Sequence, residues 1–311
     1  MTPVVDLRAA VTERLAEAGY AAGWSALRHT PDPVARGLFA RIGEFTGRRG
    51  GGPAQLRRNL ARVVGTTPDD VPDQLLVDAM SSYLRYWCEA FRLPSADPVD
   101  VAAHVHIPDG DRQHLADAHA RGKGVVLALP HTGNWDAAGV WLVQNYGTFS
   151  TVAERLKPES LYRRFVDYRE SLGFEIFPLS GGEQPPFAEL AQRLRDGGIV
   201  CLLGDRDLAR HGVPVTLFGE PTRMPAGPAK LAVDTGAALL PAHHWFDAAP
   251  DSTLFIGEPI DVAGGIPAAT QALADVFERN IAAHPADWHM LQPLWEADWS
   301  EERRHRVEGA E

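Results

Sequence analysis

Apolar residues near the start of the chain recur at steps of three and four positions, with charged residues between them. This spacing predicts an amphipathic helix, apolar on one side and charged on the other. Its apolar positions are Val4, Leu7, Val11, Leu15, Ala18 and Ala22. Further helices are predicted over about 33–47, 53–64 and 71–91, because glycine- and proline-rich breaks separate these stretches. We therefore expect the first hundred residues or so to be almost entirely helical.

The pattern changes near residue 104, where short apolar runs begin to alternate with helical stretches. The strands predicted from these runs cover 125–129, 199–203, 213–218, 239–242 and 254–256. The helices predicted around them cover about 135–145, 159–172, 186–196, 227–235 and 268–283. Alternation of this kind is typical of an α/β fold, here a mostly parallel mixed sheet flanked by helices. Such sheets place their functional residues beyond the carboxyl ends of the strands.

No internal repeat, long linker or shift in composition divides the chain. Its 311 residues, of which 45% are hydrophobic and 23% charged, are enough for a large buried core and are typical of a globular protein. We therefore expect a single domain over 1–311, in which a mostly helical portion, 1–103, packs on an α/β core, 104–311.

The charge is unevenly distributed along the chain. The overall charge of −11 argues against general nucleic-acid binding, which needs a basic surface. Residues 1–62, however, hold ten arginines against five acidic residues, a net charge of +5. A basic helical end suits an anionic membrane surface, and a solvated arginine-rich face is the alternative. Because no stretch is long and apolar enough to span a bilayer and no signal peptide is evident, we expect a peripheral protein on the cytoplasmic face of the cell membrane.

Neither the cysteines nor the paired histidines suggest a metal site. Cys88 and Cys201 lie far apart and match no metal-ligand or disulfide pattern. His243 and His244 are adjacent but lack a third ligand, so they are interpreted as structural. The sequence therefore predicts no metal ion and no cofactor.

The clearest candidate for catalysis is His131, in the segment GVVLALPHTGNWD at 124–136. An apolar strand ends just before the histidine, and glycine and asparagine form the turn into a helix that carries Asp136. An acid at this spacing can fold back and hydrogen-bond one imidazole nitrogen, which leaves the other as a general base. We predict that His131 and Asp136 form a catalytic pair; a purely structural histidine at a strand end is the alternative.

The motif HTGNWD at 131–136 resembles the HX4D signature of the lysophospholipid and glycerolipid acyltransferases. Several longer words extend the resemblance to the family of actinobacterial phosphatidylinositol mannoside acyltransferases, in the branch that includes the lipid A lauroyl-type enzymes. These words are GYAAGW at 19–24, QLRRNLARV at 55–63, YWCEAFRLP at 86–94, AERL at 153–156 and WHMLQP at 288–293. The resemblance covers about 19–296.

The resemblance implies transfer of a long, palmitoyl-like acyl chain from acyl-CoA, as co-substrate, to a mannose hydroxyl of phosphatidylinositol mannoside. Because a thioester is already activated, the hydroxyl can attack directly, and the sequence contains no G-x-S-x-G nucleophile motif. Three alternatives stay open: acylation of another glycolipid or lysophospholipid, hydrolysis with His131 as the base, and a non-catalytic lipid-binding protein of the same fold.

A second polar segment, Gly204-Asp205-Arg206-Asp207, follows the predicted strand 199–203 and should lie at the same sheet edge as His131. Asp205 is the favoured residue to orient His131 or the incoming hydroxyl, Asp207 is the other possibility, and Arg206 could bind a phosphate. The alternative is an aspartate and arginine pair that only satisfies the strand end. The resemblance adds further substrate-binding candidates, which are Glu154, Arg169 and His289.

Overall fold

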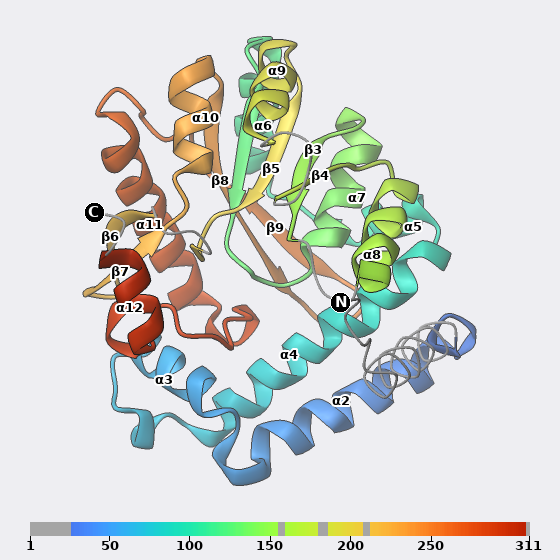
Figure 1. Cartoon of the computed structure of the whole chain (residues 1–311). Coiled ribbons are helices and arrows are strands. Elements are labelled where there is room, and N and C mark those ends of the chain that lie inside the picture. The colour runs from blue at the N-terminus through green and yellow to red at the C-terminus, as the bar shows by residue number, and fades with distance from the viewer. Residues whose placement is uncertain (1–25, 155–158, 180–185, 208–211, 309–311) are drawn as a thin grey trace, which may run out of the picture.

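The computed structural model describes residues 26–154, 159–179, 186–207 and 212–308 (Figure 1). The helix predicted from Val4 to Ala22 lies outside the described residues. None of the helices in the described ranges is long and apolar enough to cross a bilayer.

The other predicted helices of the N-terminal portion are present. They are α2 (Asp32–Arg48), α3 (Ala54–Val63) and α4 (Asp73–Arg92), followed by the short α5 (Pro98–Ala103). Helices α2 and α4 cross closely because Gly43 and Gly47 of α2 lie against the backbone of α4. A Cβ atom at Gly43 would lie 2.7 Å from Cα of Ser81, and one at Gly47 would lie 2.6 Å from Cα of Val77.

The core is a seven-stranded sheet with the order β1-β9-β8-β2-β5-β3-β4. The strands are β1 (Val105–His106), β2 (Val125–Leu129), β3 (Ser150–Ala153), β4 (Glu175–Pro178), β5 (Ile199–Leu203), β8 (Ala238–Phe246) and β9 (Ser252–Ile256). All neighbouring strands pair in parallel except β8 and β9, which are antiparallel. The predicted mostly parallel mixed sheet is therefore confirmed.

Helices cover both faces of the sheet, because successive residues of its buried strands point to opposite sides. On one face Val126 and Ala128 of β2 pack with α9 (Phe187–Arg195), α10 (Gly227–Thr235) and α11 (Gly265–Ala283). On the other face, Val125 and Leu127 pack with three further helices. These are α6 (Asp109–Ala120), α7 (Trp135–Tyr146) and α8 (Glu159–Ser171).

One predicted strand does not join the sheet. The run 213–218 forms β6 (Val213–Leu217), which among the described strands pairs only with β7 (Glu220–Met224), in an antiparallel hairpin. Phe218 and Gly219 connect them with φ angles of 49° and 74°, as a tight two-residue hairpin turn requires. The hairpin packs on α11, and the final helix is α12 (Glu301–Glu308).

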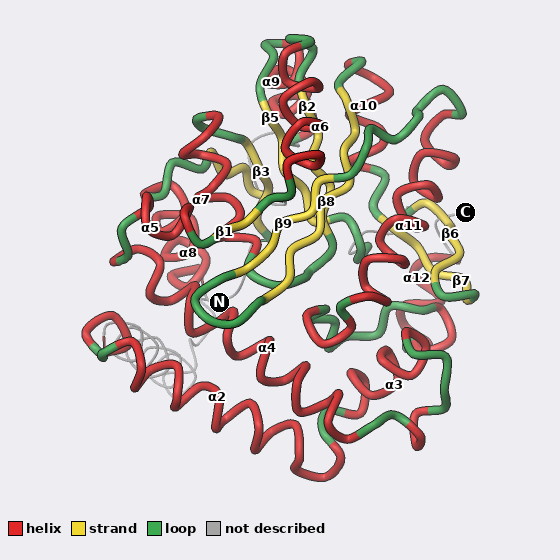
Figure 2. The backbone as a smooth tube through the Cα atoms, turned by 180° about the vertical axis from the view of Figure 1, so that it is seen from behind, coloured by secondary structure: helices red, strands yellow, loops and turns green. Residues whose placement is uncertain are grey.

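The helical portion lies beyond the sheet edge at which β2 and β5 end. Figure 1 and the reverse view in Figure 2 both show α2, α3 and α4 below this edge. The N-terminal helices are thus brought to the edge where a parallel sheet places its functional residues.

Candidate active site

His131 and Asp205 follow two neighbouring parallel strands. Leu129, the last residue of β2, pairs with Leu203, the last residue of β5, so each candidate lies two residues beyond its strand end. The structure places Nδ1 of His131 2.5 Å from Oδ1 of Asp205. The main-chain N–H of His131 also donates to Oδ2 of Asp205 at 2.9 Å. Asp205, rather than Asp207, is therefore the carboxylate that orients the histidine.

Asp205 is fully buried and receives a third donor, Nε1 of Trp288, at 3.0 Å from Oδ2. Burial alone would raise the pKa of this carboxyl. The positive charge and hydrogen bonds of His131, together with the Trp288 indole, outweigh burial and hold the pKa of Asp205 below its ordinary value. With Nδ1 directed at an ionised carboxylate, Nε2 of His131 is the nitrogen left to accept a proton.

Asp136 occupies a different position from the one predicted. Its carboxylate accepts from Nε of Arg169 at 2.8 Å, from Nη2 of Arg169 at 3.2 Å and from the hydroxyl of Tyr86 at 3.1 Å. Asp136 was predicted to hydrogen-bond the imidazole of His131, but Asp205 makes that contact instead. The physical reason is that Asp136 lies in the first turn of α7, where its side chain is buried against α8 and α4, and a buried carboxylate needs a cation.

Arg169, which was predicted to bind substrate, is the ion-pair partner of Asp136, and both residues also line the apolar cavity described below. Its side chain is 18% exposed. Burial opposes the charge on the guanidinium, but the adjacent Asp136 outweighs burial and raises the pKa of Arg169 above its ordinary value. Burial also raises the pKa of Tyr86 well above its usual range, so this hydroxyl remains protonated and donates to Asp136. The three side chains hold α4, α7 and α8 together beneath the turn at 131–134, which carries the candidate base His131 and is therefore named the catalytic turn.

Glu154 and Arg206, two other predicted substrate-binding residues, lie together at the neighbouring strand ends. Nη2 of Arg206 lies 3.4 Å from Oε2 of Glu154, and Nη1 of Arg206 donates to Oε1 of Gln292. The Glu154 side chain is half exposed, whereas that of Arg206 is mostly buried. The pair lies beside Asp205, because Arg206 directly follows Asp205 in the chain.

His289 lies directly beside His131. Its main-chain N–H donates to the carbonyl of His131 at 2.8 Å, and its Nε2 atom lies 3.0 Å from Oγ of Ser82. Burial, with a contribution from the charge of His131, lowers the pKa of His289 to about 3, so its imidazole is neutral. Its Nδ1 atom is buried without a hydrogen-bond partner among the residues that the structure describes.

His243 and His244 are buried behind the catalytic turn. Nδ1 of His244 accepts the main-chain N–H of Asn134 at 2.8 Å. Burial lowers the pKa of both imidazoles to about 3. Within the described ranges, no group of three or more histidine, cysteine, aspartate or glutamate side chains is arranged to hold a metal ion.

Two functional contacts come from residues that the sequence did not mark for these roles. Trp288 supplies its indole N–H to Asp205 from a segment that also pairs with the catalytic turn at Thr132. Tyr86 supplies its hydroxyl to Asp136 from α4. Both lie in words that carry the family resemblance, WHMLQP and YWCEAFRLP, which was the only signal in the sequence.

An apolar cavity lies next to these residues, between the sheet and α7. The ring of Trp135 joins it to the catalytic turn, because it contacts the His131 ring with centroids 5.7 Å apart and also lines the cavity. Most of the lining is aliphatic or aromatic, including Leu127, Leu129, Leu142, Phe149, Leu203 and Ile256. The site therefore combines an oriented proton acceptor with space for an apolar group.

Comparison with known proteins agrees with the resemblance described above. The bacterial lipid A biosynthesis acyltransferase family matches the chain over residues 8–297. A phosphatidylinositol mannoside acyltransferase from Mycolicibacterium smegmatis is 58% identical over 294 residues, which cover 94% of this chain and 96% of that protein. The Mycobacterium tuberculosis protein of the same name is 57% identical over 302 residues, covering 97% and 95%. The chain therefore belongs to the bacterial lipid A biosynthesis acyltransferase family.

Proposed function

We propose that this enzyme transfers a long, palmitoyl-like acyl chain from acyl-CoA to a mannose hydroxyl of a phosphatidylinositol mannoside, with His131 as general base. The observation that carries the proposal is the contact between His131 and Asp205, beside an apolar cavity. The acceptor class is supported by relatives that bear this activity in their names and share 57–58% of their residues with the chain.

The proposed reaction is a direct attack on the thioester. Nε2 of His131 takes the proton of the sugar hydroxyl while its oxygen forms a bond to the thioester carbonyl carbon. Asp205 stabilises the resulting imidazolium through Nδ1. The carbon–sulfur bond then breaks, and the departing thiolate takes the proton back from His131. The products are the ester and free coenzyme A, and no cofactor besides the acyl-CoA co-substrate is required.

The apolar cavity is the proposed position for the start of the acyl chain. Its open volume is about 80 Å³, so a long chain must displace lining side chains to enter fully. Burying a methylene group stabilises a complex by about 0.8 kcal/mol, so a long chain gains substantial affinity from such a lining. Cys201 lies in this lining, and burial raises the pKa of its thiol far above its ordinary value. The thiol is therefore protonated and serves as an apolar wall, which agrees with a mechanism without a covalent nucleophile.

Arg206 is the proposed contact for a phosphate of coenzyme A or of the acceptor lipid. Its partner Glu154 lies 3.4 Å away and is half exposed, so their ion pair contributes little and a phosphate can replace it. Arginine is well suited to phosphate because its planar guanidinium can donate two parallel hydrogen bonds.

Membrane attachment is proposed to occur through α2. Four large apolar side chains recur on one side of this helix at steps of four, four and three, and each is between 41% and 59% exposed. They are Val34, Leu38, Ile42 and Phe45. The same part of the chain carries Arg41, Arg48 and Arg49, which suit an anionic surface at about 1 kcal/mol each. We propose reversible attachment to the cytoplasmic face of the membrane.

The proposal is tested with purified enzyme, radiolabelled palmitoyl-CoA and candidate acceptors presented in mixed vesicles, with product masses determined by mass spectrometry. We expect a palmitoylated phosphatidylinositol mannoside and an equal amount of free coenzyme A. Release of free fatty acid without acceptor would instead identify a hydrolase, and acylation confined to a lysophospholipid would replace the proposed acceptor.

A further inference from the structure

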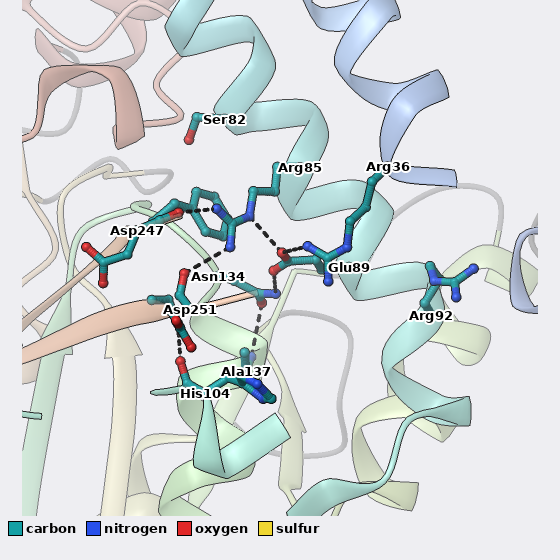
Figure 3. Close-up of polar contacts among 12 residues, drawn as sticks. Arg36, Ser82, Arg85, Glu89, Arg92, His104, Asn134, Ala137, Asp247 and Asp251 are labelled. Atoms are coloured by element: carbon teal, nitrogen blue, oxygen red, sulfur yellow. Dashed lines mark hydrogen bonds and ion pairs between the residues drawn. The ribbon is translucent and has the colours of Figure 1, made fainter. Parts of the chain in front are cut away.

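A partly buried carboxylate on α4 contacts the catalytic turn through Asn134. Glu89 has a side chain that is 17% exposed, and its Oε2 atom accepts from Nδ2 of Asn134 at 2.9 Å (Figure 3). Its Oε1 atom accepts from Nε of Arg85 at 2.8 Å and from Nη1 of Arg36 at 3.3 Å. One carboxylate therefore contacts the catalytic turn, its own helix and α2.

Asn134 is the residue through which Glu89 acts on the turn. Its Oδ1 atom accepts the main-chain N–H of Ala137 at 3.0 Å and so caps the N-terminus of α7. Its own main-chain N–H donates to Nδ1 of His244 at 2.8 Å. Because Oδ1 is used by the helix, the side-chain NH2 must point the other way, and this buried donor is satisfied by Glu89.

The catalytic turn has little freedom to move without losing such contacts. Gly133 has a φ angle of +54°, and a Cβ atom there would lie 2.3 Å from Nδ1 of His244. The turn is held by several hydrogen bonds. Asp205, the carbonyl of Asp287 and Nδ1 of His244 accept the main-chain N–H groups of His131, Gly133 and Asn134, the N–H of His289 donates to the carbonyl of His131, and Glu89 accepts from the Asn134 side chain. We expect the loss of the contact with Glu89 to shift the geometry of His131.

The two arginines that donate to Oε1 of Glu89 hold its carboxylate in place. Arg85 also donates to the carbonyls of Asp247 at 2.6 Å and Asp251 at 3.0 Å, as Figure 3 shows. Cavities lie on both sides of the pair formed by Arg36 and Glu89, and these two residues line both of them. Through the ion pair of Arg36 with Glu89, polar contacts connect α2 to the turn.

We propose that Glu89 is a positioning residue for acyl transfer: its carboxylate holds Asn134, and through Asn134 it fixes the turn that presents His131 to the hydroxyl. The inference rests on the proposed function, because its effect is measured as a rate of transfer. Glu89 does not touch the reacting atoms: it contacts Asn134, whereas Asp205 contacts His131.

The test compares Glu89→Ala and Glu89→Gln with wild-type enzyme. We expect Glu89→Ala to lower kcat about 10- to 100-fold, since a displacement of about 1 Å costs on the order of 100-fold in rate. The KM for palmitoyl-CoA should stay within about twofold, because the apolar cavity is untouched. Glu89→Gln keeps one acceptor oxygen for the three donors and should therefore lose less activity than Glu89→Ala. If Glu89→Ala does not fold, Glu89→Gln is the variant that tests the proposal.

Asp298→Asn is a matched control. The Asp298 side chain is 12% exposed and accepts from Arg62 and Gln55 of α3, so it forms a comparably buried ion pair that joins the C-terminal segment to α3 and does not involve the turn. We expect this variant to lose thermal stability while kcat stays within about twofold of wild type. A loss of kcat shared equally by Asp298→Asn would overturn the proposal, because the effect would then be one of general stability.

Hydrogen exchange of the peptide 131–137 supplies a readout that does not depend on activity. The amides of Asn134 and Ala137 should exchange faster in the Glu89 variants and at the wild-type rate in Asp298→Asn. Unchanged exchange, or a kcat of Glu89→Ala within twofold of wild type, would overturn the positioning role. If wild-type enzyme makes no acylated product, the proposed function fails, whereas the exchange measurement still decides whether Glu89 holds the turn.

Discussion

Asp205 holds His131 at two points, because Oδ1 lies 2.5 Å from the imidazole Nδ1 and Oδ2 accepts the main-chain N–H at 2.9 Å. The same carboxylate thus fixes both the ring and the backbone that carries it. Trp288 occupies a further position on Oδ2 and excludes water from it. A base held in this way needs little reorganisation when the proton arrives.

The first prediction concerns this pair. Asp205→Asn should lower kcat on the order of 10²- to 10⁴-fold, since the amide can neither stabilise an imidazolium nor enforce the required tautomer. Steady-state kinetics with palmitoyl-CoA and the mannoside acceptor measure the effect. Asp207→Asn is the control and should retain most of its activity. Equal losses of kcat in the two variants would mean that Asp205 has no specific role in orienting His131.

Asp136 and Arg169 should act mainly through stability. Removing one partner leaves a buried charge unpaired, so Asp136→Asn and Arg169→Met should each lower the free energy of unfolding by about 3–5 kcal/mol. The double variant should lose less than the sum of the two, because neither charge is then stranded. Urea denaturation measures this coupling. If Asp136→Asn instead lost activity with unchanged stability, a direct action of Asp136 on the imidazole would be favoured.

Stability should fall as the pH falls below about 6.5. Burial lowers the pKa of His243, His244 and His289 to about 3 in the folded protein, whereas an unfolded chain protonates them near 6.5. Each favours unfolding in acid by up to about 1.4 kcal/mol per pH unit. Asp287 acts in the opposite direction, because burial raises its pKa to about 6 from an ordinary value of 3.8, so the folded state gains a proton between these values.

Urea denaturation at pH 7, 6 and 5 tests this linkage. Wild-type protein should become less stable at each step, and Asp287→Asn should show a steeper loss because the opposing carboxyl is absent. A free energy of unfolding that stays constant over this range would mean that these histidines are protonated in the folded state.

The exposed apolar side of α2 should mediate membrane binding. Leu38→Glu and Phe45→Glu introduce charge on this side and should reduce co-sedimentation with anionic vesicles about tenfold or more, and binding of wild-type protein should weaken with salt. Val99→Glu is the control, because Val99 is a 66% exposed residue of α5. Binding that is indifferent to salt, or equally affected by Val99→Glu, would place the attachment surface elsewhere.

Strands β2 and β5 could be predicted to the residue, because buried parallel strands are continuous apolar runs, here bounded by glycine or proline. By contrast, β1 and β4 are too short to give a periodic signal. The run that forms β6 has strand character, but a sequence pattern does not specify its partner, and here that partner is the adjacent β7.

The candidate site likewise could be predicted only in part. The convergence of His131 and Asp205 could be predicted because two parallel strands end at one edge. The direction of Asp136 could not, since it depends on a turn containing Gly133 with a positive φ angle and on the cation that α8 supplies. The contacts of Trp288 and Glu89 join residues 83 and 45 positions apart in the sequence, and no local pattern encodes them.

The central claim is that His131 is the base that activates the acceptor hydroxyl. Its most direct test is the kcat of His131→Ala for palmitoyl transfer, measured beside the affinity of the same protein for palmitoyl-CoA. The account predicts a fall in kcat on the order of 10²- to 10⁴-fold with donor affinity within about twofold of wild type. Near-normal turnover by a folded His131→Ala enzyme would contradict it.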